Sequence, residues 1–111
     1  MDVTQTHIDH ASVLHLSGRM DASTSSGVEQ IIQSALTEGR KNLVLECGAL
    51  AYISSAGLRV VLSAAKKTKT AGGKLALCNL TSDVKQVFEI SGFSSILPIF
   101  DHENEAVKSV S

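Results

Sequence analysis

The sequence predicts an α/β fold: one domain over residues 1–111, with a mixed, mostly parallel β-sheet, an N-terminal antiparallel hairpin and about four packing helices. Short apolar runs typical of strands alternate with stretches of helical apolar spacing, which is the pattern of parallel strands joined by helices. The first two runs are separated only by a turn, which favours antiparallel pairing. A chain of 111 residues can build one hydrophobic core but not two.

The first elements are a hairpin and a helix. Val3 to Ile8 and Val13 to Leu16 are β-like runs with turn-forming residues between them. The chain leaves the second strand at Gly18. Residues 22–26 then offer several N-caps for a helix that ends by Gly39. The inward face of this helix comprises Val28, Ile31, Ile32 and either Ala35 or Leu36.

A third strand and a second helix follow. Leu43 to Leu45 is apolar without alternation, as expected of a strand that is covered on both faces. Residues 51–57 connect this strand to a helix that runs to about Ala71, where a pair of glycines ends it. The buried face of the second helix has the i, i+3, i+4, i+7 spacing of Leu58, Val61, Leu62 and Ala65.

The last third of the chain adds two strands and two helices. Leu75 to Cys78 is a fourth strand, and residues 81–83 cap a third helix. Ile96 to Phe100 is a last strand, which belongs at a sheet edge because Pro98 cannot donate a ladder hydrogen bond. A terminal helix covers residues 101–110. The inward side chains are Val84, Val87, Phe88 and, as a further candidate, Ile90 in the third helix, and Ala106, Val107 and Val110 in the fourth.

Composition narrows the classes of function. A formal net charge of −1 gives no global field toward nucleic acid or an acidic membrane, and the lack of Trp with a single Tyr argues against base stacking. No apolar run approaches the roughly 20 residues of a membrane span, and the N-terminus lacks a signal-peptide pattern, so we expect a cytoplasmic protein. Cys47 and Cys78 each end an apolar run without a C-x-x-C motif, which favours buried, reduced thiols.

The sequence offers little for catalysis or metal binding. Ile53 to Gly57 lacks the first glycine of a hydrolase nucleophile elbow, and the chain has no phosphate-binding loop. No three potential ligands have the spacing of a metal site. We therefore expect no enzymatic activity, no metal and no cofactor. The histidines His7, His10, His15 and His102 are interpreted as surface residues.

Two adjacent serines, Ser54 and Ser55, lie between the third strand and the second helix. A serine there can cap the helix by accepting a hydrogen bond from a free backbone N–H, and the same position favours a phosphate. From these residues alone, a cap and a phosphorylation switch both remain open. Asp21 by itself is a turn or cap residue. Three lysines within residues 66–69 suit the negative end of the helix dipole, with a basic docking patch as the alternative.

Four motifs give the chain a resemblance to a known family. They are Leu16 to Asp21, Tyr52 to Leu58, the pair Gly72-Gly73 and Phe88 to Phe93, in family order along nearly the whole chain. With them, the chain resembles STAS domains, and more narrowly the single-domain anti-sigma factor antagonists of bacterial partner-switching systems. The resemblance implies a STAS fold and a regulator rather than an enzyme.

The resemblance also implies two protein partners. One is a serine-kinase anti-sigma factor, which binds ATP and phosphorylates one serine of the antagonist. The other is a metal-dependent serine phosphatase, which removes that phosphate. The unphosphorylated antagonist binds the kinase and thereby releases its sigma factor.

The family motif assigns roles to individual residues. An acidic residue precedes the phosphorylated serine in that motif, so the resemblance implies Ser55 as the phosphoacceptor. Ser54 then occupies the acidic position and is the second choice, and Ala56 and Gly57 follow the site. Asp21 matches a second acidic position beside the phosphosite. The implied docking surface is the exposed helix face after the switch, with Arg59, Ser63 and Lys66.

Two alternatives stay open at this point. The captured partner could control secretion, motility or a signalling enzyme instead of a sigma factor. The chain could also be a constitutive ligand-binding or transport-associated STAS module, in which both serines are only caps. We expect a monomer or a weak homodimer, without a nucleic-acid or membrane partner.

Overall fold

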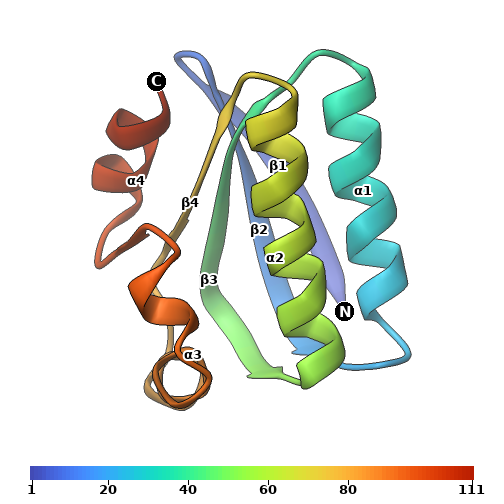
Figure 1. The fold of residues 1–111 in the computed structure, drawn as a ribbon, viewed down its shortest axis with the longest axis vertical. Helices are drawn as coiled ribbons and strands as arrows, with labels where there is room; N and C mark the ends of the chain where they lie inside the picture. Colours follow the sequence, from blue (N-terminus) through green and yellow to red (C-terminus); the bar gives the residue numbers. More distant parts are fainter.

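A five-stranded mixed sheet, in the order β1-β2-β3-β4-β5, forms the centre of the molecule, which a computed structural model describes over residues 1–111 (Figure 1). Strands β1 and β2 are antiparallel, and the other neighbouring pairs are parallel. This confirms the predicted fold class. The strands are β1 (Asp2–Ile8), β2 (Ala11–Met20), β3 (Asn42–Ile53), β4 (Lys74–Cys78) and β5 (Ile99–Phe100). The helices are α1 (Ser25–Thr37), α2 (Ser55–Thr70), α3 (Ser82–Ile90) and α4 (Glu103–Val110), with a 3₁₀ turn, η1 (Phe93–Ser95).

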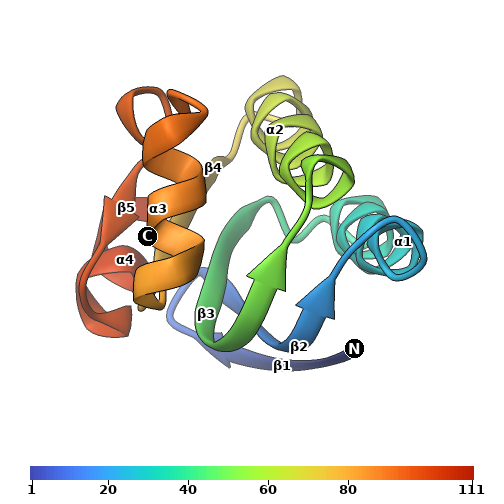
Figure 2. The same cartoon turned by 90° about the horizontal axis from the view of Figure 1, so that it is seen from below.

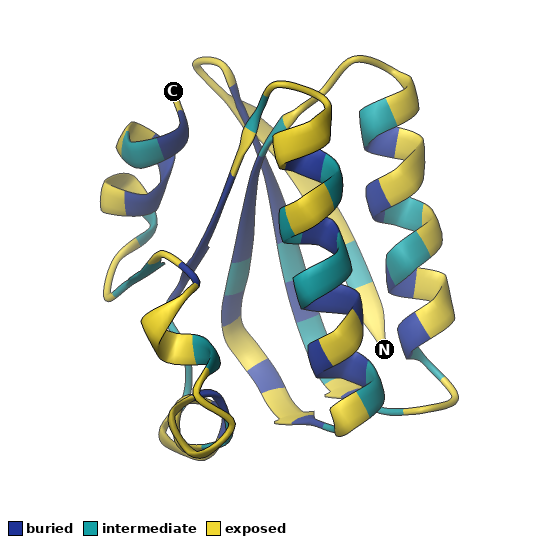
Figure 3. Ribbon diagram, in the orientation of Figure 1, coloured by how far each residue is buried: buried dark blue, intermediate teal, exposed yellow.

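The two faces of the sheet are covered by different helices (Figure 2). Helices α1 and α2 pack on one face, where Leu14 and Leu45 belong to the larger core. Helix α4 packs on the other face, where Val13 and Val44 belong to a smaller core. Because successive side chains of a strand point to opposite faces, double coverage requires an unbroken apolar run. This explains the pattern at residues 43–45. Figure 3 shows the resulting burial of the central strands, next to an exposed β1.

The predicted helix faces agree with the observed cores. Val28, Ile32 and Ala35 of α1 are buried, as are Leu58 and Val61 of α2. All three predicted residues of α4 are buried in the smaller core. The partly buried members are Ile31, Leu36, Leu62, Ala65 and Val87.

Strands β2 and β3 are longer than predicted. Strand β2 does not end at Gly18 but continues to Met20, and β3 does not end at Leu45 but continues to Ile53. The stretch 51–53, expected as a connection, is therefore strand. The apolar pattern misses these extensions because the pairing of β2 with β3 shifts register twice, between His15 and Ser17 and again after Gly18. Such irregularities interrupt the two-residue alternation on which the strand prediction depends.

The C-terminal region contains two corrections. Ile90, a candidate inward residue, is 79% exposed at the end of α3. The predicted last strand is too long: only Ile99–Phe100 pairs with β4, and Ile96 is 65% exposed. Its predicted edge position is confirmed. Pro98 lies just before the strand and contacts β4 through its carbonyl, which accepts a hydrogen bond from the Leu77 N–H at 2.9 Å. This contact uses the proline only as an acceptor, so it does not require a backbone N–H on Pro98.

Both cysteines are buried free thiols, as predicted. Cys78 ends β4, but Cys47 lies within β3 rather than at its end. Burial raises the pKa of Cys78 to about 12 and raises the pKa of Cys47 as well, so both thiols stay protonated. None of the helices has the length and apolar character needed to cross a membrane.

Candidate functional site

The turn from β3 into α2 is built around Ser54. This residue has extended backbone angles and is the N-cap of α2, where its Oγ accepts a hydrogen bond from the Gly57 N–H at 3.3 Å. Its own N–H donates to the Met20 carbonyl at 2.9 Å. Ser54 thus uses both its side chain and its backbone to fasten the helix to the end of β2.

Ser55 is the first residue of α2 and is exposed. Its hydroxyl takes no part in the capping hydrogen bonds, which are made by Ser54. The first backbone N–H groups of a helix lack intrahelical partners and carry partial positive charge, so this end of α2 favours negative charge. A free hydroxyl at such a place can take a phosphate without loss of the cap.

Gly57 allows α2 to lie close against β2. A Cβ atom at this position would lie 2.7 Å from Ile53 Cγ1, 2.9 Å from Met20 O and 3.1 Å from Met20 Cγ. Real Cβ atoms essentially never come within 3.0 Å of another atom, as the first two of these contacts would require. The glycine is therefore required by the packing of the helix N-terminus on the strand end.

Asp21 directly follows Met20, on the other side of the same junction. Its carboxylate accepts hydrogen bonds from the Ser23 hydroxyl at 2.8 Å and the Ser23 N–H at 3.0 Å, and from the N–H and hydroxyl of Thr24, both at 3.2 Å. These bonds, with that of the Ser23 hydroxyl the largest, hold the pKa of Asp21 below its ordinary value. The carboxylate therefore stays ionised and orders the turn into α1.

Arg19 and Tyr52 lie beside each other just before these turns. They are register partners of β2 and β3, and the Arg19 guanidinium lies 4.2 Å from the centre of the Tyr52 ring. This is a cation–π contact. Both side chains are exposed at the end of the sheet that carries the serine turn.

The outer face of α2 continues away from Ser55. Arg59 and Lys66 are exposed, and Ser63 is half-buried. The spacing of four and three residues places them along one side of the helix. Lys67, farther toward the helix end, pairs with Glu29 of α1 at 3.8 Å. The lysines near the end of α2 thus include one structural ion pair.

Comparison with known protein families finds a match over most of this chain. The family model of the STAS domain matches residues 2–106. This chain belongs to the STAS domain family.

Relatives of this STAS protein carry a common name. BtrV of Bordetella bronchiseptica, named as an anti-sigma factor antagonist, is 40% identical over 106 residues, which cover 96% of this chain and 91% of BtrV. The anti-sigma F factor antagonist of Paenibacillus polymyxa is 29% identical over 108 residues, with 96% and 92% coverage. These relatives are named as regulators, not as enzymes, which agrees with the prediction of a non-enzymatic protein.

Solved STAS structures share the fold. An anti-sigma factor antagonist from Mycobacterium paratuberculosis superposes with a TM-score of 0.89 at 19% identity, covering 98% of this chain and 92% of that one. The antagonist SpoIIAA in its unphosphorylated form gives 0.83 at 21% identity, with 97% and 95% coverage. Its phosphorylated form, from Bacillus, gives 0.75 at 20% identity, with 97% and 98% coverage.

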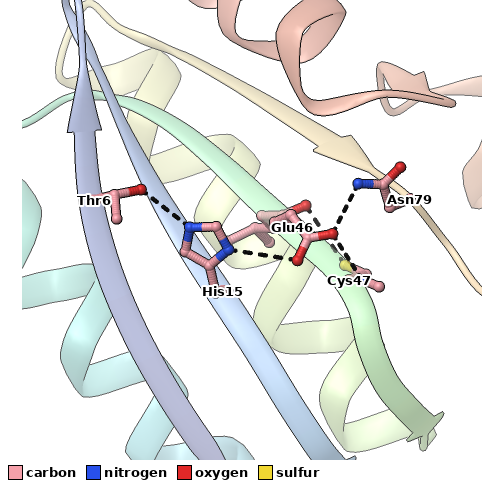
Figure 4. A network of polar contacts seen from close by, with 7 residues as sticks. Thr6, His15, Glu46, Cys47 and Asn79 are labelled. Carbon is pink, nitrogen blue, oxygen red and sulfur yellow. Dashed lines mark hydrogen bonds and ion pairs between the residues drawn. The ribbon is translucent and has the colours of Figure 1, made fainter.

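A second polar cluster lies on the STAS sheet face opposite α1 and α2 (Figure 4). Glu46 accepts hydrogen bonds from Asn79 at 2.9 Å and from the Gly48 N–H at 3.0 Å, and His15 lies 3.5 Å from its carboxylate. Thr6 bonds the other side of the His15 ring at 3.0 Å. These contacts lie next to the register shift between β2 and β3, so His15 has a structural partner rather than being a free surface residue. No group of three metal-ligating side chains occurs in the chain.

The STAS fold brings some of the predicted site residues together at one end of the sheet. Ser54, Ser55 and Gly57 form one turn, and the hydrogen bond from Ser54 to Met20 brings Asp21 to the same end of the sheet. Sequence reasoning missed Arg19 and Tyr52. A signal was available, since the carboxyl ends of neighbouring parallel strands meet at one edge, and both residues lie within the family motifs at the ends of their strands.

Proposed function

We propose that this STAS protein is an anti-sigma factor antagonist switched by reversible phosphorylation of Ser55. In its unphosphorylated form it binds a serine-kinase anti-sigma factor and releases that kinase's client. The observation that carries the proposal is the exposed hydroxyl of Ser55 at the first position of α2, beside a cap made by another residue. The 40% identity with BtrV over nearly the whole chain supports it.

The hydrogen bonding of the two serines favours Ser55 over Ser54 as the phosphorylated residue. The Ser54 oxygen is committed to the Gly57 N–H, and the residue is half-buried. A phosphate on Ser54 would replace the cap, whereas a phosphate on Ser55 would leave it in place. Ser and Asp are about equally good N-caps, so Ser54 can do the structural work of the acidic residue in the family motif.

Phosphorylation should change binding more than it changes the fold. It adds about −1.5 to −2 charges and three acceptor oxygens at the positive end of α2, which tolerates them. A partner packed over Ser55 would bury this charge near the ionised Asp21. A penalty of roughly 4 kcal/mol would weaken binding about a thousandfold. The two solved forms of SpoIIAA are consistent with a fold that carries a phosphate.

The kinase contacts, in this proposal, follow the outer face of α2. Arg59, Ser63 and Lys66 lie on the side of the helix that begins at the phosphosite. The kinase supplies the ATP, a metal-dependent phosphatase restores the active form, and the exchange takes place in the cytoplasm. A pull-down with the kinase identifies whether the released client is a sigma factor or a regulator of secretion or motility.

Phosphorylation in vitro tests the proposal. The protein is incubated with ATP and a purified serine kinase of the anti-sigma factor class from the same organism, and then analysed by intact mass and phosphopeptide mapping. We expect one added phosphate on Ser55, none in Ser55→Ala, and normal phosphorylation in the matched control Ser54→Ala. Ser55→Ala should keep kinase binding and Ser55→Asp should weaken it. Phosphate on another residue, or equal binding by both variants, refutes the switch.

A further inference from the structure

The Arg19–Tyr52 pair is the most distinctive exposed feature near the phosphosite. Tyr52 is 39% exposed, and the guanidinium of Arg19 lies over its ring, 4.2 Å from the ring centre. Arg19 takes part in none of the ion pairs of the chain. Stacking on the ring fixes the orientation of the guanidinium and leaves its N–H donors free for a partner.

A small hollow borders Tyr52 on the α3 side. It has a volume of about 100 Å³ and is lined by Ala51, Tyr52, Ile53, Asp83, Val84 and Val87. Five of these six residues are hydrophobic. A single aliphatic side chain could fill such a space and would contact Tyr52 there. The exposed guanidinium and the apolar hollow thus both border Tyr52.

We infer that Arg19 and Tyr52 anchor the docked kinase, with Arg19 receiving a kinase carboxylate and the hollow receiving an apolar kinase side chain. This inference rests on the proposed function and extends its surface from α2 to the ends of β2 and β3. Tyrosine and arginine are, with tryptophan, the residue types enriched among energetic hot spots of interfaces. A carboxylate is the matching group because guanidinium and carboxylate form paired, charge-assisted hydrogen bonds.

The kinase is the occupant because its binding must cover the phosphosite. Tyr52 precedes Ser55 by three residues, so the two lie within roughly 10 Å along the chain. A standard interface covers about 800 Å² per partner, which corresponds to a radius of roughly 16 Å. An interface centred on Ser55 therefore includes Tyr52 and its neighbour Arg19. A phosphate on Ser55 would also repel the kinase carboxylate that faces Arg19, which adds to the switch.

Binding measurements with matched variants test the inference. Dissociation constants for the kinase that phosphorylates Ser55 are measured with Tyr52→Ala, Arg19→Gln and the wild type. Ile8→Ala is the control for Tyr52, since Ile8 is also 39% exposed but lies at the opposite end of the sheet, beside the hairpin turn. Arg40→Gln is the control for loss of an exposed positive charge.

We expect Tyr52→Ala to weaken binding about 30-fold or more and Arg19→Gln about tenfold, with both controls within about twofold. Arg19→Gln should also reduce the salt dependence of the association rate, whereas Tyr52→Ala should not, because only the arginine meets a charge. Circular dichroism checks that each variant is folded. Arg19→Glu serves as a second variant at this exposed position, and it should weaken binding more than Arg19→Gln because it puts like charges face to face.

The possible outcomes separate the two proposals. If Ser55→Asp weakens binding but the Arg19 and Tyr52 variants bind like the wild type, the anchor is wrong and the switch stands. If the Tyr52 and Ile8 variants weaken binding equally, the anchor is also wrong. A wild-type protein that binds no serine kinase contradicts both proposals.

Discussion

Replacing Gly57 by Ala tests how tightly the phosphosite is built onto the end of β2. The added Cβ would lie 2.9 Å from the Met20 carbonyl and 2.7 Å from Ile53 Cγ1. The carbonyl cannot turn away easily because it accepts the Ser54 N–H, so the helix or the strand must shift. Overpacking of this kind costs about 1–3 kcal/mol, whereas Gly to Ala within a helix returns about 0.5–1 kcal/mol. We expect a net loss of about 1–2 kcal/mol in the free energy of unfolding.

Urea denaturation measures this loss. With an m-value of ~2 kcal/mol per M, the midpoint should fall by roughly 0.5–1 M while the m-value stays unchanged. The melting temperature should fall by roughly 4–8 °C. Displacement of the α2 N-terminus should also weaken kinase binding.

The chain offers a matched control in Gly27. It is the third residue of α1, as Gly57 is the third residue of α2, but a Cβ on Gly27 would meet no atom within 4 Å. Gly27→Ala should therefore stabilise the protein by about 0.5–1 kcal/mol. A Gly57→Ala variant as stable as the wild type, or the same change at both glycines, would refute the packing argument.

Three further predictions follow from the same turn, its neighbour Asp21 and the core. Ser54→Ala should lose about 1 kcal/mol in urea denaturation and Ser54→Asp should regain it, since Ser and Asp cap equally well; equal stability of all three would contradict the cap. Because the pKa of Asp21 is lowered in the folded state, its ionised carboxylate stabilises the fold above the unfolded pKa of about 3.9, and this stabilisation is lost as the pH falls through the folded pKa. Asp21→Asn should therefore make the free energy of unfolding depend less on pH below about pH 4. An unchanged pH dependence in this variant would count against the argument. Because burial raises the pKa of Cys47 and Cys78, the native protein should not react with a thiol reagent at about pH 8, whereas urea-denatured protein should. The free energy of unfolding should also fall above about pH 8.5, since the thiols of the unfolded chain then ionise and those of the native protein do not. A fast reaction of the native protein would contradict the burial of the thiols.

The serine turn illustrates what a local pattern can and cannot decide. Ser54 and Ser55 were equivalent candidates for a cap or a switch from their position alone. The assignment of the cap to Ser54 depends on one hydrogen bond from the Gly57 N–H and on the packing of that glycine against Met20. The contact with Met20 joins residues more than thirty positions apart, so no helical or strand periodicity reports it.

The errors in the predicted elements have the same origin. The pattern located β3 correctly at Leu43–Leu45, where both faces are covered and the side chains are apolar. It missed the extension to Ile53 because the register shift with β2 interrupts the alternation of side chains. It also overextended β5, since an apolar run such as residues 96–100 carries no information about whether a neighbouring strand is long enough to pair with it.

The sequence by itself determined the order and type of the main helices and strands, most of the buried faces and the family motifs, because all of these depend on residues close together in the chain. Only the tertiary structure decided the lengths of β2 and β3, which of the two serines caps α2, and the contact of Arg19 with Tyr52. The physical reason is that parallel strands joined by a helix meet through hydrogen bonds and packing between distant segments. Those distant contacts set which side chains stand exposed at the end of the sheet, where we propose that the kinase docks.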